Sequence, residues 1–211
     1  MTTTRARARA RAAVPNGATG NPPAGTTSDL GRLGTRLIVI GTTCTGKSTL
    51  AQELSERGGL AFVELDALYW EPGWAPAAPD VFQQRVRDAI AAGRWVIAGN
   101  YTGQQQEISW PHAQTIIWLD LPLRLVLRRV VQRSWQRSRS RELLWGTNRE
   151  RFWEQLRVWR TDDSLISFAI KTHRSRRRRF EQALQDPRWT QITFIRLRSR
   201  AEVADWLCSV G

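Results

Sequence analysis

Short runs of consecutive apolar residues recur along the chain, and stretches with helical spacing separate them. The run "RLIVI" (36–40) is typical of a strand buried on both faces. Four further runs have the same character: "LAFVELD" (60–66), "RWVIAGN" (94–100), "TIIWLDLP" (115–122) and "ITFIRL" (192–197). The pattern therefore predicts five short strands.

Apolar residues at helical spacing predict helices between these strands. Leu50 and Leu54 share one face of a helix expected over residues 47–57. A second helix is expected over residues 78–93, with Asp80 near its N-cap. Its apolar side is predicted to consist of Val81, Val86 and Ile90. Later helices are expected over residues 122–142, 150–159, 163–184 and 199–207, the third interrupted or frayed at "RSRRRR" and the last capped by Ser199.

Strands that alternate with helices predict an α/β fold, in which a parallel sheet carries helices on both faces. We expect a single doubly wound domain over residues 35–211. Residues 1–34 are predicted to form a disordered tail, because "TRARARARAA" and the Gly/Pro-rich "PNGATGNPPAGTTS" cannot bury a core. A solvated tail is favoured over one that binds nucleic acid.

The net charge of +13 narrows the range of partners, because it favours polyanionic or phosphorylated ones. Arginine dominates the basic residues, which suits bidentate phosphate recognition and equally fits a bias in genome composition. No apolar stretch approaches the roughly 20 residues of a membrane span, and no secretory signal is expected. Cys44 and Cys208 form no metal-binding or disulfide pattern, so a cytoplasmic location is expected. The sequence does not indicate an oligomeric state.

The stretch "GTTCTGKST" (41–49) lies between the first predicted strand and the first predicted helix. It fits the Walker A pattern G-x-x-x-x-G-K-[ST] in full, in the strand–loop–helix context that the pattern requires. Glycines let the backbone curl so that its N–H groups point at phosphate oxygens, and the helix N-terminus adds a positive dipole end. The residues predicted to bind ATP are Gly41, Thr42, Thr43, Cys44, Thr45, Gly46, Lys47, Ser48 and Thr49.

Three of these residues have predicted roles of their own. Lys47 is expected to reach the β- and γ-phosphates, and Ser48 to place its hydroxyl on Mg²⁺. Thr49 is expected to bond the α-phosphate. The predicted cofactors are therefore ATP and Mg²⁺.

Ligands of such sheets bind beyond the carboxyl ends of the strands, so the residues there are candidates for a site. Asp66 closes the second predicted strand, where it could accept a proton from a substrate hydroxyl or hold a metal-bound water; a turn or cap carboxylate is the alternative. Gly99, Asn100 and Tyr101 close the third, either beside a ligand or as an ordinary turn. For Asp120, which closes the fourth, a helix cap is favoured over a metal ligand.

Arginines recur along the helix expected after Pro122. Arg129, Arg133 and Arg137 are four residues apart and share one face. A charge run more often forms a solvated face. Because this row follows a P-loop sheet, we expect at least one of its arginines to neutralise charge during phosphoryl transfer. The densest basic cluster, "HRSRRRRF" (173–180), is interpreted as a solvated helix, because no nucleic-acid-reading pattern surrounds it.

From about Arg36 to Leu207 the chain resembles the adenylate-kinase-like P-loop proteins usually called DNA topology modulation proteins. The resembling segments are "GTTCTGKSTLAQELSERGGLAFVELDALYWEPGW", "RWVIAGNY", "TIIWLDLP", "GTNRERF" and "IRLRS". With the wider nucleoside monophosphate kinase group, the resemblance implies a three-layer P-loop NTPase with a five-stranded parallel core. It also implies a helical lid, here at about residues 134–160, and binding of ATP and Mg²⁺.

The resemblance also assigns arginines to phosphate. In the wider group a "D-x-P" after the fourth strand precedes two arginines, seven and eleven residues after the proline. Pro122 therefore implies that Arg129 and Arg133 contact phosphate. Arg149, in "NRE", falls where a lid arginine that contacts ATP is expected.

Two positions depart from the family pattern. The third strand usually ends "DGNY", with an Asp that holds Mg²⁺ through water, and here that position is Ala98. Either Asp66 or Asp120 compensates, or magnesium binding is weakened. Cys44 replaces a common loop glycine, which other P-loops tolerate.

These observations predict a kinase that transfers the ATP γ-phosphoryl group to a small acceptor, either a nucleotide or a hydroxylated metabolite. The predicted catalytic residues are Lys47, Asp66, Arg129 and Arg133, and the predicted acceptor-binding residues are Asp66, Gly99, Asn100 and Tyr101. The alternative is a nucleotide-dependent protein that binds DNA or another partner with little or no turnover. Nucleic acid is the less favoured partner, and the sequence does not name the acceptor.

Overall fold

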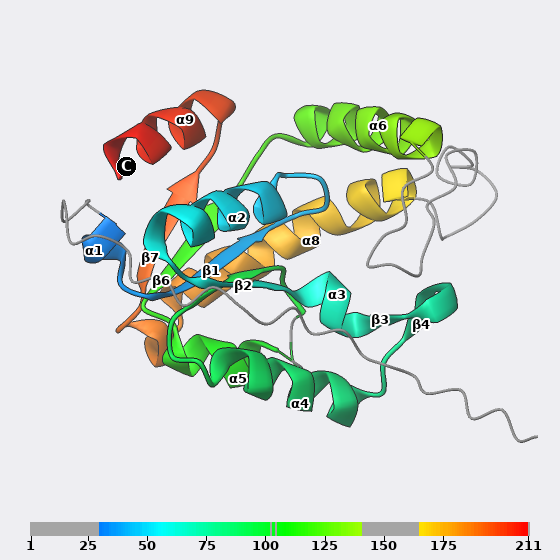
Figure 1. The fold of residues 1–211 in the computed structure, drawn as a ribbon. Helices are drawn as coiled ribbons and strands as arrows, with labels where there is room; N and C mark the ends of the chain where they lie inside the picture. The colour runs from blue at the N-terminus through cyan, green and yellow to red at the C-terminus, as the bar shows by residue number, and fades with distance from the viewer. Residues whose placement is uncertain (1–29, 102, 104, 141–164, 211) are drawn as a thin grey trace, which may run out of the picture.

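The computed structural model describes residues 30–101, 103, 105–140 and 165–210 (Figure 1). The predicted tail up to residue 29 lies outside the described residues, as do residues 141–160 of the predicted lid with Arg149 and the helix expected over 150–159. Among the helices of the described part, none is long and apolar enough to cross a membrane.

Five parallel strands form the central sheet. They are β1 (Arg36–Gly41), β2 (Ala61–Glu64), β5 (Trp95–Ala98), β6 (Thr115–Leu119) and β7 (Thr193–Leu197). Their order across the sheet is β2-β5-β1-β6-β7, and every neighbouring pair is parallel. The predicted fold class, a five-stranded parallel sheet with helices on both faces, is confirmed.

The connections between strands are mostly helical. The α-helices are α1 (Leu30–Leu33), α2 (Lys47–Gly58), α3 (Leu65–Tyr69), α4 (Pro79–Ile90), α5 (Gln106–Ser109), α6 (Leu123–Ser140), α8 (Leu165–Gln185) and α9 (Arg200–Ser209). Short 3₁₀ turns cover Pro72–Trp74, Trp110–His112 and Pro187–Trp189. Strands β3 (Trp70–Glu71) and β4 (Ala75–Pro76) form a small antiparallel hairpin after α3. Ser199 caps α9 as predicted, accepting from the Glu202 N–H.

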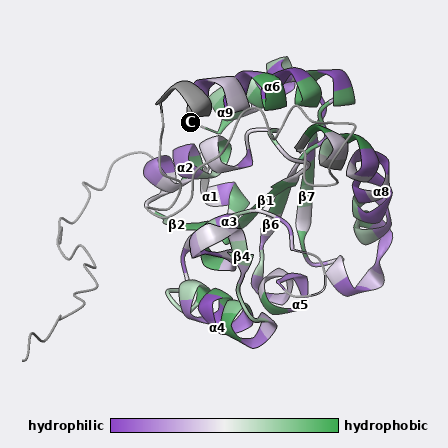
Figure 2. Ribbon diagram, turned by 90° about the vertical axis from the view of Figure 1, so that its right-hand side faces the viewer, coloured by the Kyte–Doolittle hydropathy of each residue, from purple (hydrophilic) through white to green (hydrophobic). Residues whose placement is uncertain are grey.

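The alternation of side chains along β1 divides the core into two layers. Leu37 and Val39 pack in one cluster with Leu50 and Leu54 of α2. Ile38 and Ile40 face the other way, into a cluster that residues of α4, α5 and α8 complete. Figure 2 shows the hydrophobic residues gathered on the central strands and the inner sides of the helices. Because both faces of the sheet are covered, its strands read as continuous apolar runs.

The folded part begins earlier than the sequence indicates. Leu33 of α1 is buried in the same cluster as Leu37, and its carbonyl accepts a hydrogen bond from the Thr115 hydroxyl at 2.6 Å. The structure therefore includes residues before Thr35, where we placed the start of the domain. A single turn of helix carries too few residues for its periodicity to be recognised.

Helix α4 buries a different stripe from the predicted one. Phe82 and Val86 are fully buried, with Ile90 packed against the same cluster, whereas Val81 is 39% exposed. The buried residues lie four apart, so Phe82 belongs to the stripe and the assignment of Val81 was wrong. The N-cap is Ala78, with Pro79 at the first turn, and it makes no side-chain cap hydrogen bond. Asp80 lies in the first turn, where its charge opposes the helix dipole favourably.

Helix α8 continues without a break through "RSRRRR", where an interruption was predicted. Ala169, His173, Phe180 and Ala183 are buried, and they recur at helical spacing on both sides of the basic run. One stripe of the helix therefore stays packed on the protein while most of the arginines point to solvent. The tertiary contact supplies the stability that the charge run alone would not.

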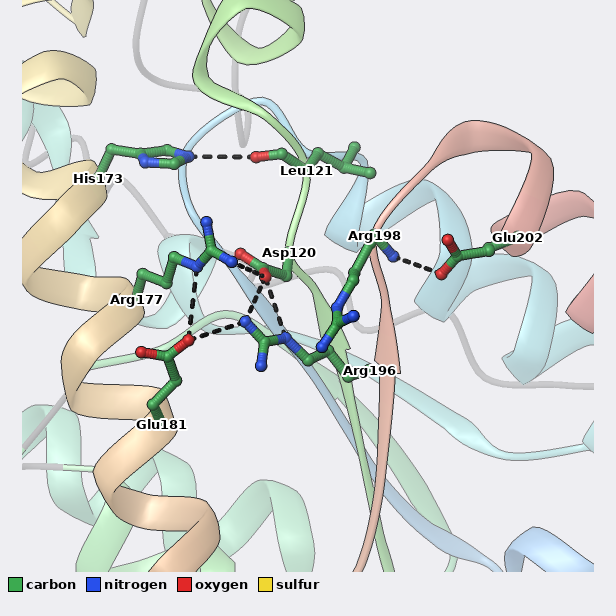
Figure 3. Close-up of polar contacts among 8 residues, drawn as sticks. All are labelled: Asp120, Leu121, His173, Arg177, Glu181, Arg196, Arg198 and Glu202. Atoms are coloured by element: carbon green, nitrogen blue, oxygen red, sulfur yellow. Dashed lines mark hydrogen bonds and ion pairs between the residues drawn. The ribbon is translucent and has the colours of Figure 1, made fainter.

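Asp120 follows β6, and its buried carboxylate is held in a network of ion pairs (Figure 3). Its carboxylate, only 4% exposed, accepts from Arg196 Nη2 at 2.7 Å and lies 3.3 Å from Arg177 Nη2. Glu181 of α8 lies 2.9 Å from the same Arg196 nitrogen, and the Arg196 guanidinium stacks on Trp118 at 4.1 Å. The carboxylate thus joins β6 and β7 to α8, and the interpretation of Asp120 as a helix cap was wrong.

The network predicts a stability defect in Asp120→Asn. The change leaves the Arg196 charge poorly compensated in a largely buried position, although Glu181 remains beside it. We expect the free energy of unfolding, measured by urea titration, to fall by roughly 2–3 kcal/mol, below the ~3–5 kcal/mol of a fully buried broken pair. Glu107→Gln, which removes an exposed contact to Arg188 at 3.5 Å, is the matched control and should cost less than about 1 kcal/mol. Equal effects of the two substitutions would contradict a structural role for Asp120.

Candidate active site at the carboxyl edge of the sheet

The stretch 41–49 forms a tight loop between β1 and α2. Gly41 is required there, because a Cβ atom would lie 2.7 Å from Thr45 Oγ1 and 2.9 Å from the Leu119 carbonyl oxygen. Gly46, with φ of 97°, precedes the first turn of α2. Cys44 adopts φ of 55°, the left-handed region that favours glycine, which explains why a glycine is common at this loop position. The loop is thus curled as the Walker A pattern predicts.

Lys47 lies at the start of α2 with its ammonium group on the loop. Its Nζ donates to the Thr42 carbonyl at 2.9 Å, and Thr45 Oγ1 donates to the same oxygen at 2.9 Å. Burial lowers the pKa of Lys47 to about 8; the charge of Asp66 opposes this shift, and that of Arg176 adds to it. An ammonium in this position is poorly hydrated, so an anionic ligand would stabilise its charged form.

Ser48 donates a hydrogen bond from its hydroxyl to Glu64 Oε1 at 2.7 Å. Glu64 is the last residue of β2, and sequence analysis did not single it out. The signal was present, because a carboxylate at the end of a parallel strand lies on the ligand edge. The predicted strand extended to residue 66, so Asp66 was the carboxylate at its end.

Asp66 lies in the first turn of α3, two residues after β2 ends, and not at the end of a strand. Its Oδ1 accepts from the Tyr101 hydroxyl at 2.6 Å. Burial, together with the Asp66 charge, raises the pKa of Tyr101, so the phenol keeps its proton. The Tyr101 ring in turn packs against the Tyr69 ring, tilted by 40°, with 4.4 Å between the ring centroids. The structure therefore joins two predicted site residues, Asp66 and Tyr101, and brings Asp66 within the electrostatic range of Lys47.

The other two residues after β5 behave differently from each other. Gly99 adopts φ of 135°, and a Cβ there would lie 2.9 Å from Leu65 Cβ, so its small size serves packing against α3. Asn100 has a buried Oδ1 without a hydrogen-bond partner. An unpaired buried acceptor costs free energy, so Asn100 is suited to receive a donor from a ligand.

Arg129 and Arg133, both on α6, lie at the loop. Arg129 Nη1 donates to the Thr45 carbonyl at 2.6 Å and would be 3.5 Å from a Cβ on Gly46. Arg133 has a buried Nε without a hydrogen-bond partner, and its charge lowers the pKa of Lys47. The two predicted arginines thus lie at the same loop as the predicted lysine.

Arg176 of α8 is a site residue that sequence analysis missed. Burial lowers its pKa, with the charge of Asp66 acting against that shift, and its own charge lowers the pKa of Lys47. It therefore lies among the predicted site residues, although we interpreted "HRSRRRRF" as a solvated helix. The spacing could have identified it: Arg176 is three residues after buried His173 and four before buried Phe180.

The remaining predicted residues are less informative. Thr42 has a buried hydroxyl without a partner, and Thr43 makes only a 3.9 Å contact to the Cys44 sulfur. Thr49 is exposed on α2. Arg149 lies outside the described residues.

Together, the fold and the loop define a P-loop nucleotide-binding protein. A family model described as an AAA domain matches residues 37–154, more than half of the chain, and the chain belongs to this family of P-loop NTPases. No curated protein sequence matches the chain.

Solved structures of several kinases are similar in fold. A gluconokinase from Sinorhizobium meliloti 1021 is 15% identical, with a TM-score of 0.46 over 84% of this chain and 90% of its own. A sugar kinase from Janibacter sp. HTCC2649 is 15% identical, with a TM-score of 0.45 over 82% and 92%. Shikimate kinase from Bacteroides thetaiotaomicron is 17% identical, with a TM-score of 0.46 over 81% and 93%. This likeness is too weak to assign an activity.

The lowered pKa of Lys47 predicts that ATP binding takes up a proton in alkaline solution. Above about pH 8 the ligand-free ammonium loses its proton, and triphosphate should restore it. At pH 8.5 we expect uptake of about 0.5–1 proton per ATP, measured by calorimetry in buffers of different ionisation enthalpy, and affinity should fall as pH rises through 8. Lys47→Met should bind more weakly and without this uptake. The same uptake in both proteins would contradict the assignment.

Proposed function

We propose that the protein is an ATP-dependent kinase that transfers the γ-phosphoryl group to a hydroxyl of a small acceptor. The observation that carries the proposal is the meeting of the loop lysine, Lys47, with the Asp66–Tyr101 pair and Arg176. A carboxylate held beside the loop lysine suits a kinase, because the acceptor hydroxyl must lose its proton during phosphoryl transfer.

The loop residues would bind the triphosphate. The curled backbone of residues 41–46 and the N-terminus of α2 suit phosphate oxygens. Lys47 would exchange the Thr42 carbonyl for the β- and γ-phosphates, and Arg129 and Arg133 would neutralise charge on the transferring group. We further propose that Arg149, in the lid segment expected over residues 134–160, binds ATP.

The magnesium ion fits the donors at the start of α2. They are oxygens, the ligands that Mg²⁺ prefers, and the Ser48 hydrogen already points to Glu64, which leaves the hydroxyl lone pairs for a cation. When bound, Mg²⁺ would neutralise the β- and γ-phosphates. Ser48 would hold it.

The acceptor would bind between Asp66 and Asn100. Asp66 takes the proton of the acceptor hydroxyl as the hydroxyl oxygen attacks the γ-phosphorus. The bond from the γ-phosphorus to the bridging oxygen breaks, and ADP leaves with the negative charge on its β-phosphate. The Tyr101 hydroxyl orients Asp66, and the unpaired Asn100 Oδ1 would accept from a second acceptor group.

Within the P-loop family, we assign the chain to the DNA topology modulation proteins. The two segments most typical of that group, "ELDALYWEPGW" and "GNY", pack on each other through Asp66, Tyr69 and Tyr101. We propose a cytoplasmic location, because Cys44 and Cys208 are both free thiols, the state in which a reducing compartment keeps cysteines.

Asp66→Asn tests the reaction. The amide keeps the size of the side chain and can still accept from Tyr101, but it cannot take a proton. We expect ADP release from MgATP, assayed over a panel of nucleoside monophosphates and hydroxylated metabolites, to fall about 10²–10⁴-fold in kcat. ATP affinity should stay unchanged, and Asp80→Asn on α4 is the matched control. ATP binding without acceptor-dependent release in the wild-type protein would instead favour a nucleotide-dependent binding protein.

Arg176→Gln tests the arginine that α8 contributes. We expect kcat/KM for the acceptor to fall about 10²–10³-fold, the loss typical of a donor that stabilises transition-state charge. Arg178→Gln, two residues later on the exposed side of the same helix, provides the control and should leave kcat/KM unchanged. Equal losses in both variants would mean that general positive charge, and not position, matters.

A further inference from the structure

The end of β5 lacks the carboxylate that the family resemblance implies for magnesium. Its last residue, Ala98, is only 2% exposed and packs with Leu50, Ala51 and Leu54 of α2. The Ala98 side chain therefore faces the helix that begins at the P-loop. A carboxylate there would approach Ser48, and alanine offers no oxygen.

The neighbouring strand supplies a carboxylate at the same level. Glu64 is paired in register with Ala98 across β2 and β5. Paired residues of adjacent parallel strands lie about 4.8 Å apart and point to the same face of the sheet. Glu64 therefore shares the face and the height of Ala98, and its longer side chain can bridge the distance of one strand.

The hydrogen bond to Ser48 shows that the Glu64 side chain bridges this distance. Glu64 Oε1 accepts from Ser48 Oγ at 2.7 Å, so the carboxylate lies against the hydroxyl that would bind the metal. It also fixes the direction of the hydroxyl hydrogen. Mg²⁺ keeps several of its waters in such sites, and those waters need oxygen acceptors held in place.

The two other acidic candidates have different partners. Asp66 accepts from the Tyr101 hydroxyl and interacts with Lys47. Asp120 is paired with Arg196 and Arg177 in the network of Figure 3. Neither of them contacts Ser48. The contacts therefore do not favour the expectation from the sequence that Asp66 or Asp120 replaces the missing Asp.

We propose that Glu64 takes the place of the acidic residue missing at Ala98: it holds the waters of the magnesium ion and orients the Ser48 hydroxyl toward it. This inference rests on the proposed function, because it requires ATP on the loop. The acidic group reaches the same place from β2 instead of β5, and magnesium-dependent binding is retained.

Metal affinity tests this role without turnover. Mn²⁺ is titrated into the full chain with a non-hydrolysable ATP analogue and followed by electron paramagnetic resonance. Glu64→Gln should weaken Mn²⁺ binding about 10–100-fold, the usual loss when a partner of a metal ligand is removed. Affinity for the analogue in EDTA should stay unchanged. Glu56→Gln, an exposed residue on α2, makes the same change of charge and should leave Mn²⁺ affinity as in the wild type.

A rescue variant tests directly whether the carboxylate can be supplied from either strand, β2 or β5. Glu64→Ala combined with Ala98→Asp should recover most of the Mn²⁺ affinity that Glu64→Ala loses. If the buried Asp prevents folding, Glu64→Gln alone decides. Equal Mn²⁺ affinity in the wild type and Glu64→Gln overturns the inference and leaves the proposed function intact. Loss of analogue binding by Glu64→Gln in EDTA has the same two consequences. A wild-type protein that binds no analogue at all overturns both.

Discussion

The close approach between the P-loop and the end of β6 is the contact on which the site depends. Strand β1 lies between β5 and β6 and is buried on both faces, so the loop that follows it starts from a fixed point. At Gly41 the Thr45 hydroxyl and the Leu119 carbonyl occupy the space of a side chain. That contact folds the loop back over the strand ends. The same contact sets the direction of the start of α2, which carries Lys47 and Ser48.

Other elements dock onto this loop. Arg129 reaches the Thr45 carbonyl from α6, and Glu64 reaches Ser48 from β2. Each contact joins a charged side chain to a group of the loop or its helix. Three of the polar groups that remain buried without partners in the described part lie at the site: Thr42 Oγ1 on the loop, Asn100 Oδ1 after β5 and Arg133 Nε on α6. The free energy cost of leaving them unpaired is a common feature of binding sites.

Helix α8 shows how one basic run performs two tasks. Consecutive residues of a helix point about 100° apart, so Arg176 and Arg177 face different surroundings. Arg176 lies on the packed stripe and reaches the site, whereas Arg177 turns to the Asp120 carboxylate and to Glu181 (Figure 3). Arg178 and Arg179 are exposed. The function of an arginine in this run is therefore set by its angle around the helix and not by its membership of the run.

The sequence by itself determined the five strands, the helices that follow them and the phosphate-binding loop, because apolar periodicity and the glycine–lysine spacing are local properties of the chain. Burial of Phe82 in place of Val81, the ion pairs of Asp120 and the position of Arg176 were decided only by the tertiary structure. The pairing of Glu64 with Ala98 belongs to the same group. Each of these features depends on contacts between residues of distant segments. The order of the strands and the rotation of each helix determine those contacts through packing, and no short stretch of sequence encodes that packing.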